Sequence, residues 1–219
     1  MFKILMITYC LFYAASVLAL DIVKDGKAVS EIVLAKDANQ SQKLGAADLQ
    51  EFFEKISGAK VEIVPTPSGK FKNKIYVGES DFTKKLGFDL KGVEKGGYKL
   101  VVADDYAIVA GRDRHYQTTP SMYGIKWTAE DLKRFQDRVG APVMKNIGGR
   151  SRGKQVKTLG ILSQDDTGSW YAASELLQQL GVRWYHPNET IVPVSKNIVL
   201  QKQNLTKAPV SAMRPLGCY

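Results

Sequence analysis

The chain has 219 residues, of which 44% are hydrophobic, and a formal net charge of +9 at pH 7. This composition excludes wholesale disorder and provides a core for one globular domain, with room for a small second one. The basic residues are scattered except between Lys145 and Lys157, and no helix-turn-helix or zinc-ligand spacing accompanies them, so we expect no nucleic-acid binding.

The first 19 residues have the pattern of a secretory signal peptide. Lys3 precedes an apolar run from Ile4 to Leu18, and Val17 and Ala19 stand where a signal peptidase requires small or short residues. An uncleaved membrane anchor is the alternative, but the run is short for a span of about 20 residues. We therefore predict cleavage after Ala19, a secreted or periplasmic location, and no membrane segment in the mature protein.

The two cysteines predict a fold without a disulfide. Cys10 leaves with the signal peptide, so Cys218 has no partner within the mature chain. The hydrophobic core must then stabilise the fold without a cross-link.

The first predicted elements are a hairpin and a long helix. Apolar-rich runs at residues 21–24 and 31–35 are separated by a turn at Asp25-Gly26, which predicts a hairpin. Helical spacing and a glycine suited to a left-handed C-terminal cap, Gly58, predict a helix over about residues 42–57. The apolar face of that helix consists of Leu49, Phe52, Phe53 and Ile56.

Short elements follow the long helix. Residues 60–64 predict a strand that Pro65 and Pro67 stop, and residues 74–78 predict a buried strand. The serine at position 80 predicts the N-cap of a short helix that continues through Leu86.

Two pairs of neighbouring aspartates are candidates for acid–base chemistry, but both patterns favour structural roles. Asp104-Asp105 lies between the apolar runs 97–103 and 106–111, where aspartate commonly forms a tight turn, so we predict a second hairpin. Asp165-Asp166 precedes a helical pattern, which favours capping. Glycoside hydrolysis needs two carboxyl groups that face each other across a sugar, and adjacency in sequence does not supply them.

Residues 114–157 predict a loop-rich insertion between two well-patterned blocks. A short helix is expected from Thr128, where a threonine N-cap and acidic residues precede basic ones. The stretch that follows it is rich in glycine and charge, as in long loops.

Ordered elements return after the insertion. Residues 158–163 predict a strand, and Asp166 or Thr167 is expected to cap a helix that ends at Gly181. The apolar face of this helix consists of Trp170, Ala173, Leu176, Leu177 and Leu180. Three short strands are predicted after it, at residues 182–186, 190–194 and 197–201, and the stretch from Asn204 has no pattern of its own.

The order of these elements predicts the fold class. Strands, a helix, several strands, an insertion, a helix and further strands do not alternate regularly, which favours an α+β domain with a mixed sheet and two main helices. We predict that this accessory domain spans residues 20–203 and that a tail spans residues 204–219.

Histidine and glycine patterns predict neither a metal site nor a cofactor. The chain has two histidines, His115 and His186, and no spacing of three or four zinc ligands. It also lacks a nucleophile-elbow pattern and a phosphate-binding or dinucleotide-binding glycine loop.

The aromatic residues of the strand after the second helix have two interpretations. On a strand, Val182 and Trp184 point to one side, and Arg183 and Tyr185 to the other. Packing beneath the helix and against a neighbouring domain is the interpretation that the pattern favours. Alternatively, Trp184 and Tyr185 stack on sugar rings.

Several blocks, taken in their order, resemble a known domain. They are "AADLQEFFEKISGAKVEIV", "KIYVGES", "GYKLVVADDYAIVAGRD" and "LLQQLGVRWYHPNETIVPVSKNI". The chain resembles the N-terminal domain of glycoside hydrolase family 67 α-glucuronidases, and a related domain of secreted bacterial polysaccharide-degrading proteins, over residues 21–201 without the insertion. The "GRD" at residues 111–113 also matches, and its physical interpretation is a strand end with an ion pair.

The resemblance implies a non-catalytic role for this chain. In that family the domain precedes a (β/α)8 barrel, which holds the catalytic carboxylates. Ala208, Pro209 and Arg214 match the segment that opens the first barrel strand, where an arginine of related barrels contacts the sugar. A barrel needs about 200 residues or more, so its catalytic residues have no counterpart in this chain.

The resemblance therefore predicts an accessory domain of a secreted, α-glucuronidase-like glycoside hydrolase involved in polysaccharide degradation, with carbohydrate and the barrel as partners. Two alternatives remain open. One is a stand-alone binding module for acidic glycans, based on the net positive charge, residues 145–157, Trp184 and Tyr185. The other is a protein–protein interaction domain with an exposed apolar face.

Overall fold

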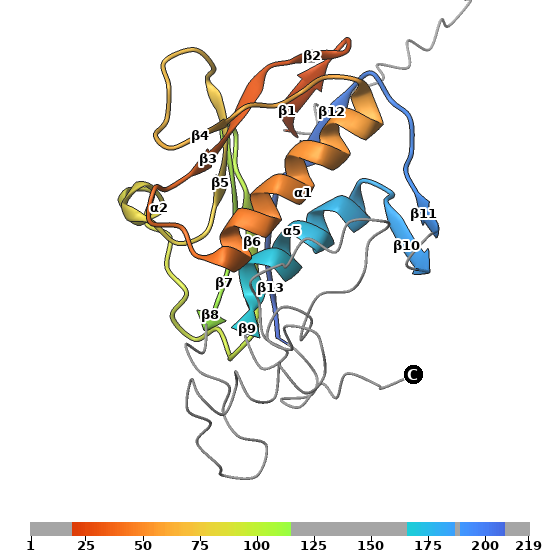
Figure 1. The fold of residues 1–219 in the computed structure, drawn as a ribbon. Helices are drawn as coiled ribbons and strands as arrows, with labels where there is room; N and C mark the ends of the chain where they lie inside the picture. Colours follow the sequence, from red (N-terminus) through yellow and green to blue (C-terminus); the bar gives the residue numbers. More distant parts are fainter. Residues whose placement is uncertain (1–18, 115–165, 187–188, 209–219) are drawn as a thin grey trace, which may run out of the picture.

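A six-stranded sheet covered on one face by two helices forms the centre of the molecule (Figure 1). The computed structural model describes residues 19–114, 166–186 and 189–208. In spatial order, the strands of this sheet are β13 (Gln203–Lys207), β6 (Tyr98–Val102), β7 (Tyr106–Gly111), β5 (Asn73–Val77), β3 (Ser30–Leu34) and β4 (Ile63–Val64).

The directions of the strands make the sheet mixed. The four strands β4, β3, β5 and β7 are parallel, whereas β6 is antiparallel to both β7 and β13. The hairpin predicted around Asp104-Asp105 is confirmed, because β6 and β7 pair across it. The predicted fold class, an α+β domain with a mixed sheet and two main helices packed on it, is confirmed.

The first predicted hairpin is wrong in one of its strands. Strand β1 (Ala19–Lys24) pairs with the two-residue β2 (Lys27–Ala28), and with β12 (Ile198–Gln201) on its other side, in a small separate sheet. Strand β3 instead joins the central sheet, parallel to β5. Ile32 and Val33 of β3 are both buried, which is the pattern of a parallel strand that is covered on both faces.

The long helix α1 (Gln40–Ser57) begins two residues earlier than predicted. Asn39 is its N-cap and forms a capping box with Gln42, because the Asn39 side chain accepts from the Gln42 amide and the Gln42 side chain accepts from the Asn39 amide. Gly58 ends the helix in the left-handed conformation, with φ 79°, as predicted.

The second main helix, α5 (Gly168–Gln179), crosses α1 at a contact between small residues. A Cβ placed on Gly45 would lie 3.3 Å from the Cβ of Ala173, so the two backbones approach closely. The core lies between these helices and the sheet, and its helical members include Leu49, Phe52, Phe53, Ile56, Ala173, Leu176 and Leu177.

The opposite face of the sheet has a thinner cover. Phe88 packs on Ile108 and Ala110 of β7, in a cluster separate from the main core. Further along the sheet, the buried carboxylate of Glu31 pairs with Lys74 on the neighbouring strand, 3.2 Å away. This face therefore combines a small apolar cluster with a buried ion pair.

Two strand predictions need correction. The strand predicted at residues 60–64 is limited to the two residues of β4. The stretch from Asn204 was expected to have no element, but residues 203–207 form β13 and pair with β6 along the edge of the sheet. By contrast, the short helix α2 (Asp81–Lys85) is capped by Ser80 and ends at Leu86, as predicted.

The described residues on either side of positions 115–165 are paired with each other. Strand β8 (Asp113–Arg114) is antiparallel to β9 (Asp166–Thr167), which leads directly into α5. The predicted insertion beyond Arg114, the helix from Thr128, the strand at residues 158–163 and the basic stretch at residues 145–157 lie outside the described residues. Within the described ranges, no helix combines the length and the apolar character that a bilayer crossing requires.

Candidate functional site

The structure describes two of the three residues predicted to bind substrate. Trp184 and Tyr185 lie in β10 (Arg183–His186), which pairs with β11 (Glu189–Ile191) in a two-stranded sheet. Arg214 lies outside the described residues, as does His115.

The ring of Trp184 packs inward, as the packing interpretation predicted. It meets Phe52 of α1 edge to face, with ring centroids 5.4 Å apart and an interplanar angle of 81°. Its indole N–H is enclosed and finds no hydrogen-bond partner among the described residues. Trp184 therefore anchors the β10–β11 hairpin to the core.

The other side of the hairpin faces outward. Tyr185 is 65% exposed, and Ile191, which lies opposite Arg183 on β11, is 53% exposed. Arg183 donates to the backbone oxygens of Gln178 and Val182 at 2.5 and 2.8 Å, so its guanidinium binds the last turn of α5 and the chain that follows it. We call the exposed side chains of Tyr185 and Ile191 the hairpin face.

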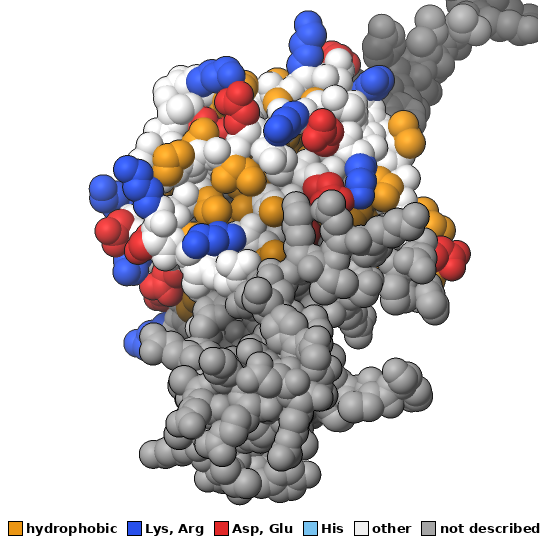
Figure 2. Space-filling view, in the orientation of Figure 1, with side chains coloured by type: hydrophobic (Ala, Val, Ile, Leu, Met, Phe, Trp, Pro, Cys, Tyr) orange, Lys and Arg blue, Asp and Glu red, His pale blue; other side chains and the backbone are white. Residues whose placement is uncertain are grey.

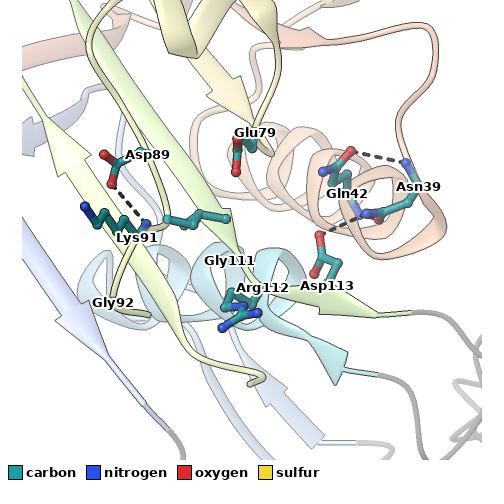
Figure 3. Close-up of a pocket in the computed structure, with 10 residues that line it drawn as sticks. Asn39, Gln42, Glu79, Asp89, Lys91, Gly92, Gly111, Arg112 and Asp113 are labelled. Carbon is teal, nitrogen blue, oxygen red and sulfur yellow. Dashed lines mark hydrogen bonds between the residues drawn. The ribbon is translucent and has the colours of Figure 1, made fainter. Parts of the chain in front are cut away.

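A second candidate site is an open polar hollow of about 530 Å³ at the carboxyl ends of β5 and β7 (Figure 3). On one side stand Asn39 and Gln42 from the start of α1, and on the other stand Asp89 and Lys91 from the loop after α2. Glu79, Leu90, Gly92, Gly111, Arg112 and Asp113 complete the lining.

Asp113 connects the beginnings of both main helices beside this hollow. Its Oδ1 accepts from the Ser41 hydroxyl at 2.8 Å and from the Ser169 amide at 2.9 Å. Its Oδ2 accepts from the Ser169 hydroxyl at 2.6 Å and from the Asn39 side chain at 3.1 Å. The Ser41 hydroxyl in turn accepts from the Trp170 amide at 3.2 Å. A negative charge at two helix N-termini is electrostatically favourable, so we call this group the Asp113 network.

The Asp113 network corrects two predictions. Thr167 is the N-cap of α5 by position, but its side chain makes no capping hydrogen bond, and Asp166 lies in β9. Asp113 satisfies the Ser169 amide in their place. The ion pair expected at the "GRD" segment is also replaced, among the described residues, by these hydrogen bonds and by a bond of 3.0 Å from Arg112 to the Val93 oxygen.

Glycines allow the strand end and the helix start to meet. A Cβ on Gly111 would overlap the backbone of Gly168, and the Gly111 amide donates to the Ser169 hydroxyl at 3.0 Å. The Arg112 amide donates to the Gly97 oxygen at 2.9 Å. Direct backbone contact thus holds Asp113 where both helices begin.

Two further enclosed carboxylates are also bound within the fold. Burial opposes ionisation of Glu31, but hydrogen bonds from Ser68 and the nearby ammonium of Lys74 outweigh burial and lower the pKa. Burial likewise opposes ionisation of Glu175, whose pKa is lowered by hydrogen bonds from Lys207, Gln179 and Tyr98. Both groups are therefore ionised structural acceptors at neutral pH.

The described residues contain no metal-binding cluster: no three or more His, Cys, Asp or Glu side chains are grouped so that they could hold an ion. On the face that Figure 2 shows, acidic and basic side chains alternate over the described surface. Among the described residues, the hollow offers hydrogen-bonding groups and the hairpin face offers apolar contact.

No protein-family model matches the chain, and no curated protein matches it. Among solved structures, it is similar to a family GH115 4-O-methyl-α-glucuronidase with specificity for decorated arabinogalactans, at 16% sequence identity and a TM-score of 0.48. The match covers 85% of this chain and 18% of that chain, so the chain spans less than a fifth of that enzyme. The likeness to a glycoside hydrolase is distant and does not single out family 67.

Proposed function

We propose that this chain is a non-catalytic accessory domain of a secreted, α-glucuronidase-like glycoside hydrolase that degrades polysaccharides. A (β/α)8 barrel of the family 67 type is its catalytic partner, and Arg214 belongs to the segment that leads into that barrel. The ordered sequence blocks that resemble the N-terminal domain of family 67 support this assignment.

The observation that carries the proposal is the Asp113 network. A carboxylate that acts as a catalytic acid or nucleophile must reach the substrate, and a hydrolase needs two of them across the glycosidic bond. Asp113 lies in a matched motif beside the hollow, yet both its oxygens accept hydrogen bonds from the helix starts. Glu31 and Glu175 are similarly bound.

The hairpin face supports contact with another domain. Tyr185 and Ile191 expose apolar surface on the hairpin, and Val194, three residues after β11, is 89% exposed. Apolar groups of this kind are suited to a partner surface.

The test is an activity assay of the purified mature chain on aryl glucuronides and on glucuronoxylan fragments, with an active α-glucuronidase as positive control. We expect no turnover above the buffer rate. Turnover that co-purifies with the homogeneous chain, and that is lost on heat denaturation, would refute the non-catalytic role. The coding DNA adjacent to this segment should also encode a barrel.

The outward orientation of Tyr185 favours a second candidate, a stand-alone module that binds acidic glycans. An aromatic ring that is 65% exposed can stack on a sugar ring, whereas Trp184 packs on Phe52. Calorimetry with glucuronoxylan and pectin tests this candidate, with Tyr185→Ala as the variant and Tyr171→Ala as a matched tyrosine control. Heat that disappears only in Tyr185→Ala supports it, and no heat with either polymer excludes it.

A further inference from the structure

We propose that the polar hollow binds a neutral, hydroxyl-rich ligand of one or two sugar rings. The identification of the ligand as a sugar rests on the proposed role in polysaccharide degradation. The site itself is inferred from the position of the hollow, the rigidity of its walls and the polar groups that the fold leaves unused there.

The hollow lies where open sheets with parallel strands commonly bind ligands. In such sheets, the crevice outside the carboxyl ends of the strands is the usual binding place. Here β5 and β7 are parallel, and their carboxyl ends lead into Glu79 and Arg112 on the lining. A volume of about 530 Å³ falls within the range of small-molecule sites, which is roughly 300–1,000 Å³.

Hydrogen bonds within the fold hold the backbone of both walls. The capping box holds Asn39 and Gln42, and the Asp113 network ties the start of α1 to the start of α5. On the opposite wall, Asp89 accepts from the Lys91 amide at 3.0 Å, which closes a local turn. Little conformational entropy is therefore lost when a ligand binds between these walls.

Several polar groups on the walls have no strong partner among the described residues. The Lys91 ammonium makes no hydrogen bond or ion pair with them, and the Gln42 side-chain N–H₂ is also unused. Within the described ranges, the ion-pair partner of Glu79 is Lys84, at 4.0 Å, the limit of such a pair. The Gln42 amide and the Glu79 carboxylate thus lie on the lining of the same hollow, and Lys91 belongs to its opposite wall (Figure 3).

The balance of charge identifies the class of ligand. Lys91 and Arg112 contribute two positive charges to the lining, and Glu79 and Asp89 contribute two negative charges outside the Asp113 network. A phosphate or a metal cation would meet like charges at close range. Hydroxyl groups both donate and accept, so a neutral polyol can use the amide, the ammonium and the carboxylate together.

The experiment is a titration followed by ¹⁵N–¹H NMR spectra of the mature chain, residues 20–219, with cellobiose, xylobiose, glucuronic acid and inorganic phosphate. We expect the neutral disaccharides to shift the amide signals of Gln42, Glu79 and Lys91, with a dissociation constant of about 1–10 mM, as befits an open site. Glucuronic acid and phosphate should bind at least fivefold more weakly, since about 1 kcal/mol of repulsion corresponds to that factor.

Two variants and two controls locate the binding. Lys91→Ala and Glu79→Gln should each weaken disaccharide binding by about fivefold, the effect of one hydrogen bond. Lys60→Ala and Glu54→Gln change exposed residues of the same types away from the hollow and should leave binding unchanged. Folding of each variant is checked by the dispersion of its own spectrum.

Three results would overturn the proposal. These are no shifts at the hollow up to about 50 mM disaccharide, the largest shifts at Tyr185, or tighter binding of phosphate than of sugar. None of them bears on the accessory role, which the hydrolysis assay tests separately. Conversely, turnover by the chain would refute the accessory role, but disaccharide-induced shifts at Gln42, Glu79 and Lys91 would still support the binding site.

Discussion

The two faces of the central sheet are stabilised in different ways. The face below α1 and α5 carries a large apolar core, in which Phe53 is completely buried. The other face has the small cluster around Phe88 and the buried pair of Glu31 and Lys74. Burial of apolar area stabilises more than a partly compensated ion pair does. The helical face therefore provides most of the stability, and the other face fixes local loop positions.

Replacing one phenylalanine by alanine on each face of the sheet should give the largest difference in the free energy of unfolding. We expect Phe53→Ala to lower the free energy of unfolding by about 4 kcal/mol, since rigid helices and strands surround the cavity that it leaves. Phe88→Ala should cost about 2 kcal/mol, because the loop that carries it can collapse. Urea denaturation measures both, and equal losses would contradict the comparison.

The Asp113 network is expected to have the next largest effect. Asp113→Ala removes four hydrogen-bond acceptances at two helix starts and should cost about 3 kcal/mol. Asp113→Asn keeps the shape but loses the charge, so an intermediate loss is expected. Asp37→Ala, at an exposed position, is the control and should change the free energy of unfolding by less than about 0.5 kcal/mol. If Asp113→Ala lowers the free energy of unfolding as little as Asp37→Ala does, the carboxylate of Asp113 is not needed to stabilise the helix starts.

The buried pair on the opposite face should make its contribution dependent on pH. We expect Lys74→Met to cost about 2 kcal/mol at pH 7, because Glu31 remains ionised in a buried position with only Ser68 as a donor. The pKa of Glu31 is lowered in the folded state, so its contribution is present above the unfolded value of 4.5 and is lost as the pH falls through the folded value.

Urea denaturation between pH 7 and pH 3 should therefore show that the free energies of unfolding of wild type and Lys74→Met converge as the pH falls. The matched control is Lys202→Met, which breaks the exposed pair with Asp104 and should change stability by less than about 1 kcal/mol at any pH. If the difference in free energy of unfolding between wild type and Lys74→Met does not narrow in acid, ionised Glu31 does not stabilise the fold through Lys74.

The smallest effect is expected from removal of residues 115–165. Arg114 and Asp166 are paired neighbours on β8 and β9, so an Asn-Gly turn can join them directly. We expect the shortened chain to unfold cooperatively, with a free energy of unfolding within about 1 kcal/mol of the parent, because closure of a shorter loop costs less entropy. Circular dichroism and urea denaturation check this, and loss of cooperative unfolding would mean that the segment belongs to the core.

Local signals explain which elements could be predicted from the sequence. Helix α1 follows from the spacing of its apolar residues and from Gly58, and the β6–β7 hairpin follows from Asp104-Asp105. Strand β13 contains one large apolar residue, Leu205, so only its pairing with β6 makes it a strand. In the same way, the sequence placed β3 beside β1, although burial on both faces draws it into the central sheet.

The candidate sites could be predicted less completely than the fold. Alternation along β10 placed Trp184 inward and Tyr185 outward, because strand geometry alone decides this. The Asp113 network joins three segments that are far apart in the chain, near Asn39, Asp113 and Ser169. The short motif "GRD" indicates that the carboxylate of Asp113 has a role, but its hydrogen-bond partners come from distant segments and follow only from the tertiary structure.

The contact between Gly111 and Gly168 limits how this molecule can evolve. A methyl group on Gly111 would overlap the backbone of Gly168, and a methyl group on Gly168 would overlap the Gly97 oxygen and the Arg112 backbone, so in both cases backbone atoms would have to move. Replacement of either glycine alone should hence displace the start of α5 from the end of β7, whatever the ligand or the partner domain.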